Sequence, residues 1–337
     1  MTTNKAITPL VKTLATLDRS MYRVQNARVT KDTLEKSFTF TFLSLFPFYK
    51  TSKDVQKLFS QSRIFLNGEL LFSLDVVVKK DDVISFISSP KDEPFARTHV
   101  RILYEDVDIV IANKPPHLLT HPAGKYYFKT LTHILSQKTN SQIFPIHRLD
   151  RETSGIVLCA KNENTRDALH EQVRKQTMKK TYFAVVFGSL SPDKGVCKLP
   201  LHIVEKKLSN GVLRDYVEVA PAGKGKSAIT QYETIKHITL NGFDCSLVTC
   251  ELRTGRKHQI RAHLAAMGCP IVGDKEHGKH PELFLDFLYA GISDKRLLEQ
   301  LGATRQLLHA QGLEFTHPVT NKKMNIQAPF WDDMVFM

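Results

Sequence analysis

The sequence predicts an α+β fold, in which helices flank a mixed and largely antiparallel central sheet. Runs rich in β-branched and aromatic residues, which are typical of buried strands, outnumber the segments with helical spacing. The strand runs are residues 100–104, 108–112, 155–160, 182–188, 228–236 and 243–252, and the helical segments are about 163–176 and 256–267. Because the strands do not alternate strictly with helices, the pattern favours this class over a doubly wound parallel sheet.

The composition is that of a folded, basic protein. The 337 residues include 47 Lys and Arg against 34 Asp and Glu, which gives a net charge of +13. This excess favours an acidic partner, most commonly nucleic acid, although a basic surface without a function would give the same charge. The chain lacks the run of about 18 apolar residues that a membrane span needs, so we expect none. The five cysteines form no C-x-x-C pair, which favours a reducing compartment over a disulfide framework.

The chain divides into four parts. Residues 1–36 are predicted to be a basic N-terminal extension; an organelle transit peptide is the alternative, so we expect a cytoplasmic location with an organelle as the second choice. Residues 37–90 are predicted to form a small α/β module with a hairpin at Asn67-Gly68, because both residues tolerate the positive φ of a tight turn. Residues 91–95 are predicted to be a linker, and residues 96–337 the main domain.

The densest group of reactive side chains is His147 to Gly155, with the sequence HRLDRETSG, just before a predicted buried strand. Asp150 stands between Arg148 and Arg151, and a nearby cation lowers the pKa of a carboxyl group. An ionised carboxylate can act as a nucleophile or a base. A surface turn with a salt bridge is the alternative interpretation.

Three other segments carry groups suited to anions or bases. Arg256, His258 and Arg261 lie where a strand meets a helix, and a helix start rich in cations suits a phosphate, although a solvated basic helix end would look the same. Lys114 precedes two prolines and is either a rigid cleft residue or part of a structural turn. Lys180-Thr181-Tyr182 combines a cation with a ring that could stack on a base, or with a ring of the core.

We expect no metal site and no cofactor. His258 and His263 are five positions apart, so they do not share a helix face as the two histidines of a zinc helix do. The sequence also contains no glycine-rich loop of the kind that binds nucleotide phosphates.

Taken together and in this order, these segments resemble the RluA-type pseudouridine synthases. The most specific pieces are HRLDRETSG at 147–155 and TGRKHQIRAH at 254–263, and the resemblance spans about residues 95–330. It implies the pseudouridine synthase fold and a cofactor-free isomerisation of uridine to pseudouridine in ribosomal or transfer RNA, with the target base flipped out. The RNA is the expected partner, and the enzyme is expected to be a monomer that binds no membrane.

The resemblance also implies roles for single residues. Asp150 matches the catalytic aspartate, and Tyr182 matches the tyrosine that contacts the base. Arg256 is expected to pair with Asp150, with Arg261 as a second choice for that pairing. Arg148 matches the arginine that replaces the flipped nucleotide.

Further residues are expected to bind RNA. Besides Arg148, these are Lys114, Lys180, Arg261 and His258. The module at 37–90 resembles the alpha-L type of RNA-binding domain, with Lys50, Lys53, Lys57 and Arg63 as its available cations. Two positions in the main domain depart from the family pattern, since His117 stands where Gly is usual and His277 where Tyr is usual.

Two other functions remain open at this point. A non-catalytic RNA-binding factor would keep the fold but would not need Asp150 and Tyr182, and both are present. A hydrolase would use Asp150 with His147 or His258 and would need a positioned water and an orienting group.

Overall fold

The computed structural model describes residues 22–31, 33–34, 37–207, 213–285 and 292–331. The chain forms two compact units, residues 1–95 with 122–133 and residues 96–121 with 134–337. Most of the predicted extension at 1–36 lies outside the described residues. None of the described helices is long and apolar enough to cross a membrane.

The first unit is a small sheet covered by two helices. Its elements are β1 (Arg23–Arg28), α2 (Phe38–Leu45), α3 (Ser52–Ser60), β2 (Ile64–Leu66), β3 (Glu69–Leu70) and β4 (Val83–Ser88), with the strands in the order β1-β4-β2-β3. Aromatic rings of the helical segment pack on the sheet, and the ring centres of Phe42 and Phe46 lie 5.5 and 4.9 Å from the ring centre of Phe86 on β4. The predicted hairpin is confirmed, because Asn67 and Gly68 both have positive φ between β2 and β3.

One boundary prediction for this unit was wrong. Residues 23–28, assigned to the extension, form β1 and pair with β4 along their whole length. Residues 91–95, predicted to be a linker, lie where the first unit ends, and their acidic side chains are bound to that unit. Asp92 accepts hydrogen bonds from Arg63, and Glu93 accepts three backbone N–H bonds from residues 127–129. A carboxylate that receives several donors fixes the backbone that carries it.

The second unit contains one large mixed sheet, as the sequence predicts. Its strands are β5 (Arg101–Glu105), β6 (Ile109–Lys114), β7 (Phe144–Pro145), β8 (Ser154–Ala160), β9 (Lys179–Phe187), β10 (Lys194–Cys197), β13 (Thr230–Leu240), β14 (Phe243–Leu252), β15 (Leu308–Thr316) and β16 (Lys323–Gln327). The main order is β10-β13-β14-β9-β15-β8-β6-β5, and the β15–β8 pair is parallel while the other pairs are antiparallel. Strands β11 (Leu201–Lys207) and β12 (Leu213–Val219) form a separate hairpin.

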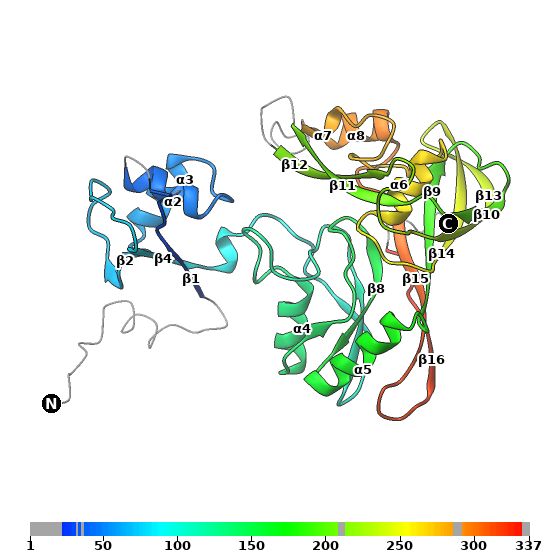
Figure 1. Ribbon diagram of the computed structural model, residues 1–337, viewed down its shortest axis with the longest axis horizontal. Coiled ribbons are helices and arrows are strands. Elements are labelled where there is room, and N and C mark those ends of the chain that lie inside the picture. The colour runs from blue at the N-terminus through cyan, green and yellow to red at the C-terminus, as the bar shows by residue number, and fades with distance from the viewer. Residues whose placement is uncertain (1–21, 32, 35–36, 208–212, 286–291, 332–337) are drawn as a thin grey trace. The chain divides into compact units, whose positions relative to one another are not determined.

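Short helices flank this sheet. They are α4 (Leu131–Thr139), α5 (Glu163–Arg174), α6 (Gln259–Ala266), α7 (Leu283–Leu285) and α8 (Asp294–Leu301), besides a 3-10 turn at Pro90–Asp92 in the first unit. The predicted helices at 163–176 and 256–267 correspond to α5 and α6, and α6 begins three residues later than expected. Helix α5 is capped by Asn162, whose side chain accepts from the N–H of Thr165, and its Leu169 packs against apolar residues of β8. The helix lies beside β8 in Figure 1.

The parallel β15–β8 pair joins the two halves of the sheet. It is short, with His309 opposite Ser154 and Ala310 opposite Gly155. Gly155 has φ +112°, and a Cβ at this position would overlap the backbone of Ala310. A glycine is therefore required where β8 begins, directly after the loop that carries Asp150.

Candidate active site

Asp150 lies in the loop that leads into β8, and its neighbours fix that loop. The backbone N–H of Leu149 donates to Thr120 Oγ1 at 3.1 Å, and the Thr120 hydroxyl donates to the Leu149 carbonyl at 3.0 Å. Leu149 is buried, whereas the side chain of Asp150 is 23% exposed. The loop thus holds the carboxylate at the edge of the core, where a ligand can reach it.

The partner of Asp150 is Arg261, a buried side chain on the first turn of α6. Its Nη1 donates to Asp150 Oδ2 at 2.9 Å. The opposite edge of the guanidinium is held by Asp274, with Nε to Oδ2 at 2.6 Å and Nη2 to Oδ1 at 2.9 Å. A third carboxylate, Glu276 Oε2, lies 3.5 Å from Nη2. One guanidinium therefore serves three carboxylates, and Asp274 fixes its orientation toward Asp150.

These contacts keep Asp150 ionised. Burial alone would raise the pKa of Asp150, but the charge and hydrogen bond of Arg261, together with His258, outweigh it and lower the pKa below its ordinary value. The pKa of Asp274 is also lowered, because Arg261 more than offsets its complete burial. Asp150 is thus a carboxylate that stays charged at neutral pH although it is largely enclosed.

The expected pairing of Arg256 with Asp150 was wrong. Arg256 lies in the exposed loop before α6, and its Nε donates to the carbonyl of Ser227 at 3.1 Å. Arg261, the second choice, takes the role because the first turn of α6 is buried and points its side chain inward, whereas the loop is on the surface. Arg256 still lines the cavity in front of Asp150.

Two adjoining hollows open above Asp150. The smaller has a volume of about 70 Å³ and the larger about 510 Å³. The residues that line both are Arg148, Asp150, Tyr182, Leu252, Arg256 and His258. Tyr182 comes from the centre of the sheet, on β9, and is 6% exposed. Burial, and then the charge of Asp150, raise the pKa of its hydroxyl, so Tyr182 is a neutral ring and hydrogen-bond donor at this wall.

Of the other residues predicted to contact RNA, Arg148 and Lys180 reach the larger hollow. Arg148 is exposed at its edge, next to Asp150. Lys180 is only partly exposed, and burial lowers its pKa to about 8. The remaining wall includes His147 and Met178. The wall of the larger hollow thus carries these two basic side chains as well as an anionic carboxylate.

The prediction that Lys114 binds RNA was wrong. Its side chain has no exposed surface, and its Nζ donates to the carbonyls of Pro115 and Leu118 at 2.9 and 2.8 Å and of Arg151 at 3.2 Å. Burial lowers the pKa of Lys114 well below its ordinary value. Lys114 ties the turn after β6 to the loop that carries Asp150, which is a structural role.

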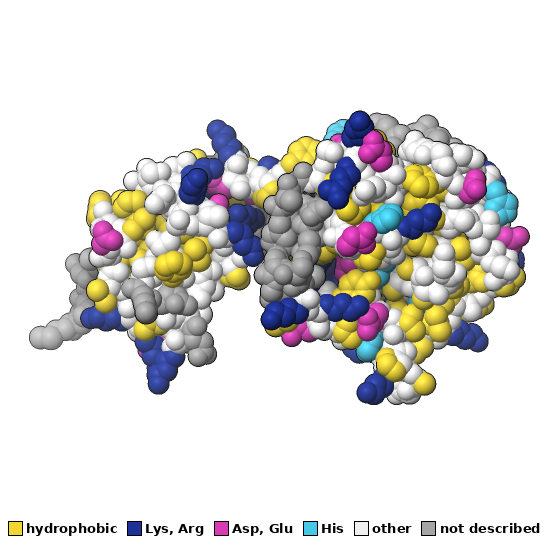
Figure 2. Space-filling model, turned by 90° about the horizontal axis from the view of Figure 1, so that it is seen from above, with side chains coloured by type: hydrophobic (Ala, Val, Ile, Leu, Met, Phe, Trp, Pro, Cys, Tyr) yellow, Lys and Arg dark blue, Asp and Glu magenta, His cyan; other side chains and the backbone are white. Residues whose placement is uncertain are grey.

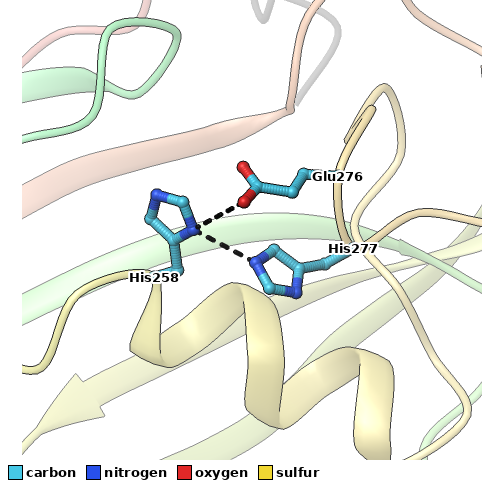
Figure 3. Close-up of side chains that lie close together, drawn as sticks. All are labelled: His258, Glu276 and His277. Atoms are coloured by element: carbon cyan, nitrogen blue, oxygen red, sulfur yellow. Dashed lines mark hydrogen bonds and ion pairs between the residues drawn. The ribbon is translucent and has the colours of Figure 1, made fainter. Parts of the chain in front are cut away.

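Sequence reasoning missed the acidic segment behind Arg261. Asp274, Glu276 and His277 follow one another closely after Gly273, and all three side chains are buried. Figure 3 shows Glu276 and His277 directed at Nδ1 of His258, which stands at the start of α6. In the sequence, His277 stood out only as a departure from the family pattern, and two carboxylates after a glycine do not reveal which arginine they hold.

His258 connects this segment with Asp150. Its Nδ1 lies 3.1 Å from His277 Nε2, and its Nε2 lies 3.8 Å from Asp150 Oδ1. Burial lowers the pKa of His258 to about 3 and that of His277 to about 4, so both imidazoles are neutral at neutral pH. Only 9% of the His258 side chain is exposed, so it offers one edge to a ligand in the cavity.

Comparisons with known proteins decide the family. A family model described as RNA pseudouridylate synthase matches residues 108–266. The chain is 31% identical over 268 residues to a Bacillus subtilis protein named uncharacterized RNA pseudouridine synthase YlyB, covering 77% of this chain and 76% of that protein. It is 33% identical over 242 residues to tRNA pseudouridine synthase C of Haemophilus ducreyi, covering 67% and 89%. The chain belongs to the RNA pseudouridine synthase family. The predicted resemblance to RluA-type synthases is thereby confirmed.

A solved structure agrees with the fold of this synthase. Human RNA pseudouridylate synthase domain containing 1 superimposes with a TM-score of 0.54 at 22% identity, covering 71% of this chain and 86% of that one. The predicted fold class is confirmed by this likeness and by the mixed sheet. As a member of its family, the synthase is an isomerase that converts uridine to pseudouridine in RNA.

Proposed function

We propose that Asp150 is the catalytic carboxylate of this synthase and that its substrate is a uridine in ribosomal or transfer RNA. The observation that carries the assignment is the Asp150–Arg261 contact of 2.9 Å at the floor of a hollow walled by Tyr182. An enclosed carboxylate would normally take up a proton, and this one is held ionised by a guanidinium. The RNA classes are those named for two relatives, tRNA pseudouridine synthase C and ribosomal large subunit pseudouridine synthase D.

The reaction explains why such a site is useful. The bond between uracil N1 and the sugar C1′ breaks, the base turns, and C5 joins C1′. The C5 hydrogen leaves as a proton and N1 takes up a proton, so no group is lost and the reaction involves no oxidation or reduction. Asp150 either attacks the sugar or base or removes a sugar proton, and both routes require the ionised form. Tyr182 and Leu252 enclose the detached base so that it cannot diffuse away.

The base must leave its stack before it can reach Asp150. Flipping costs a few kcal/mol, which the protein recovers by contacts with the extruded nucleotide. Arg148, exposed at the edge of the hollow, is placed to fill the gap in the RNA, since a guanidinium stacks on bases and binds phosphate. Arg256, Lys180 and His258 line the same space and are proposed to contact the RNA backbone.

Binding outside the hollow is proposed to depend on many weak phosphate contacts. Figure 2 shows Lys and Arg side chains spread over the face drawn and interspersed with acidic ones, not gathered into one stripe. Binding should therefore weaken as salt rises, because released counterions drive it. We assign residues 37–90 to RNA binding through the exposed Lys50, Lys53 and Lys57; Arg63 is instead engaged by Asp92. We propose residues 96–337 as the catalytic domain, which acts as a monomer.

The compartment that we propose is the cytoplasm, with an organelle as the alternative. The support is that all five cysteines are buried and free, as expected where thiols stay reduced.

The test is Asp150→Asn in the full chain. We expect pseudouridine formation, measured as tritium release from C5-labelled total RNA of cells lacking the gene, to fall to a trace, with RNA affinity within about threefold. The fold should persist because Arg261 keeps its two bonds to Asp274. Asp167→Asn, an exposed carboxylate on α5, is the matched control and should change neither quantity. Substantial turnover by Asp150→Asn would refute the assignment, and free uracil among the products would indicate a hydrolase.

A further inference from the structure

We propose that His258, Glu276 and His277 form a binding site for one divalent transition-metal ion of the zinc type. The three side chains offer two imidazole nitrogens and one carboxylate oxygen, a donor set that suits Zn²⁺ and its neighbours better than Mg²⁺ or Ca²⁺. Three protein ligands leave a fourth position open. The inference does not depend on which residue catalyses the isomerisation.

The donor atoms are already close to the spacing that such an ion requires. His258 Nδ1 lies 3.1 Å from His277 Nε2 and 3.6 Å from Glu276 Oε1, and the ligand atoms all lie within 4.8 Å of one another. In a tetrahedral site with bonds of about 2.0–2.1 Å, ligand atoms are roughly 3.3–3.4 Å apart. As Figure 3 shows, Glu276 and His277 both face the same nitrogen of His258, so small rotations would place an ion between the three.

One of the three ligand atoms receives no hydrogen bond within the described part of the chain. Glu276 Oε1 is buried and receives no hydrogen bond from any residue that the structure describes. Arg261 and Arg214 approach the other oxygen, Oε2, at 3.5 and 3.8 Å, so the two oxygens of this carboxylate have different environments. A buried carboxylate oxygen without a donor is costly, and a cation bound to Oε1 would remove that cost.

The surroundings fix the ligands and tolerate the charge. Asp274 Oδ1 accepts from the backbone N–H groups of Glu276 and His277, at 2.9 Å each. The ring of Tyr216 lies 5.0 Å from that of His277, and its hydroxyl donates to the Glu276 carbonyl at 3.1 Å. Such outer contacts hold metal ligands in place. The carboxylates of Asp150, Asp274 and Glu276 exceed the guanidiniums of Arg261 and Arg214. The charge of Lys206, which also acts on His277, is balanced by its ion pair with Glu218, so a divalent cation meets a net negative charge.

An ion at this position would be coupled to Asp150. His258 lines the hollow, which provides a path from solvent. An ion on Nδ1 leaves the ring proton on Nε2, and this atom lies 3.8 Å from Asp150 Oδ1. Metal binding would thus direct an N–H donor at that carboxylate.

The experiment uses the full chain without a histidine tag, treated with a chelator and then titrated with Co²⁺ and Zn²⁺. We expect one ion per chain with a Kd of about 1 µM or lower, by calorimetry, and a visible Co²⁺ spectrum of tetrahedral type. His277→Phe should weaken binding at least about 100-fold, and Glu276→Gln at least about 10-fold. His280→Phe, the same change three residues away at an exposed histidine, should leave binding intact.

These outcomes separate the proposal from its alternatives, and none of them uses RNA or activity. If His258 and His277 are joined only by a hydrogen bond, the wild-type chain will bind no ion at this affinity, and the proposal fails. It fails also if His280→Phe removes binding as strongly as His277→Phe. Circular dichroism checks that His277→Phe is folded. If His277→Phe is unfolded, the metal affinity of Glu276→Gln, which keeps the shape of the side chain, decides the question instead.

Discussion

Removing the guanidinium of Arg261 should move the acid limit of activity toward neutral pH. In Arg261→Gln, Asp150 loses the charge that opposes protonation, while the burial that favours protonation remains. The pKa of Asp150 therefore rises in the variant. Because the reaction needs the ionised form, activity is present above this pKa and is lost as pH falls through it. The loss thus occurs at a higher pH in the variant than in the wild-type synthase.

The size of the effect follows from the geometry. The contact of 2.9 Å between Nη1 and Oδ2 puts the two charges about 4 Å apart, and at an effective dielectric constant of about 20 their attraction is about 4 kcal/mol. Asp150 is 23% exposed, so solvent screens part of this, and we take the range as roughly 2–4 kcal/mol. At about 1.4 kcal/mol per pH unit, the acid limb of kcat/KM should move up by about one to three pH units.

The assay is kcat/KM against pH, by tritium release from labelled RNA. Arg256→Gln is the matched control, because Arg256 lines the same hollow but does not contact Asp150; its acid limb should not move. Arg261→Gln also removes the guanidinium that pairs with the buried Asp274 and leaves Glu276 with Arg214 alone, so we expect about 3–5 kcal/mol of lost stability, and the assay must run where the variant is folded. A folded Arg261→Gln with an unchanged acid limb would show that Arg261 does not set the charge of Asp150.

Three further predictions concern other residues. Burial lowers the pKa of Lys180 to about 8, so its proposed phosphate contact is present below this pH and lost above it. The number of ions released on RNA binding, measured from the salt dependence of affinity, should therefore fall by about one between about pH 7 and about pH 9. Lys180→Arg should abolish that change, and persistence of the change in this variant would exclude Lys180 as its source. Gly155→Ala should lower the free energy of unfolding by roughly 2–4 kcal/mol in urea titrations because its Cβ meets the Ala310 backbone, and a neutral result would contradict the tight β8–β15 approach. Lys114→Met should lower that free energy by about 2–4 kcal/mol, since three carbonyls lose a donor, while the folded variant binds RNA normally; a specific loss of affinity would restore the RNA role.

The sequence predicted those strands in which the buried positions are filled by apolar residues. Strands β6 and β8 are largely apolar, and β14 contains a run of buried residues at 245–248; each of the three was placed within two residues of its true bounds. Strand β15 lies at the centre of the sheet, yet no such pattern marks it. It contains a buried histidine, His309, whose Nδ1 lies 2.9 Å from Ser154 Oγ. A buried polar residue that finds its partner 155 positions away cannot be recognised from local periodicity.

Strand β1 was missed for a different reason. Its sequence, RVQNAR, is polar, and its residues are only partly buried, because it is at the edge of a small sheet. Backbone hydrogen bonds to β4 form it, and these do not depend on apolar side chains. The charge and polarity of this segment therefore suggested an extension.

For the site, the resemblance to the RluA-type synthases implied that Asp150 and Tyr182 act together, and both line one hollow, but the arginine expected to pair with Asp150 was the wrong one. Arg256 and Arg261 are both basic, and both precede or begin the same helix. They differ in burial, which depends on where the helix starts. His258 takes a left-handed conformation, φ 54° and ψ 20°, and helix α6 begins with the next residue. This turn leaves Arg256 on the surface and brings Arg261 into the core, and a pattern of residue types does not reveal it.

Side chains of the TGRKHQIRAH segment hold the ion pair between Arg261 and Asp150 in position. Gln259 Nε2 donates to Thr230 Oγ1 at 3.0 Å, and His263 Nδ1 lies 2.9 Å from the same hydroxyl, so the face of α6 that carries these two residues, four positions apart, is tied to β13. Between them stands Arg261, whose guanidinium reaches Asp150 in a loop that Gly155 and β15 fix from the other half of the sheet. The two halves each supply one member of the ion pair, and β15, which joins them, sets its distance. The position of Asp150 therefore depends on both halves of the sheet, and a substitution that loosens the β8–β15 pair should impair turnover even if no residue of the hollow changes.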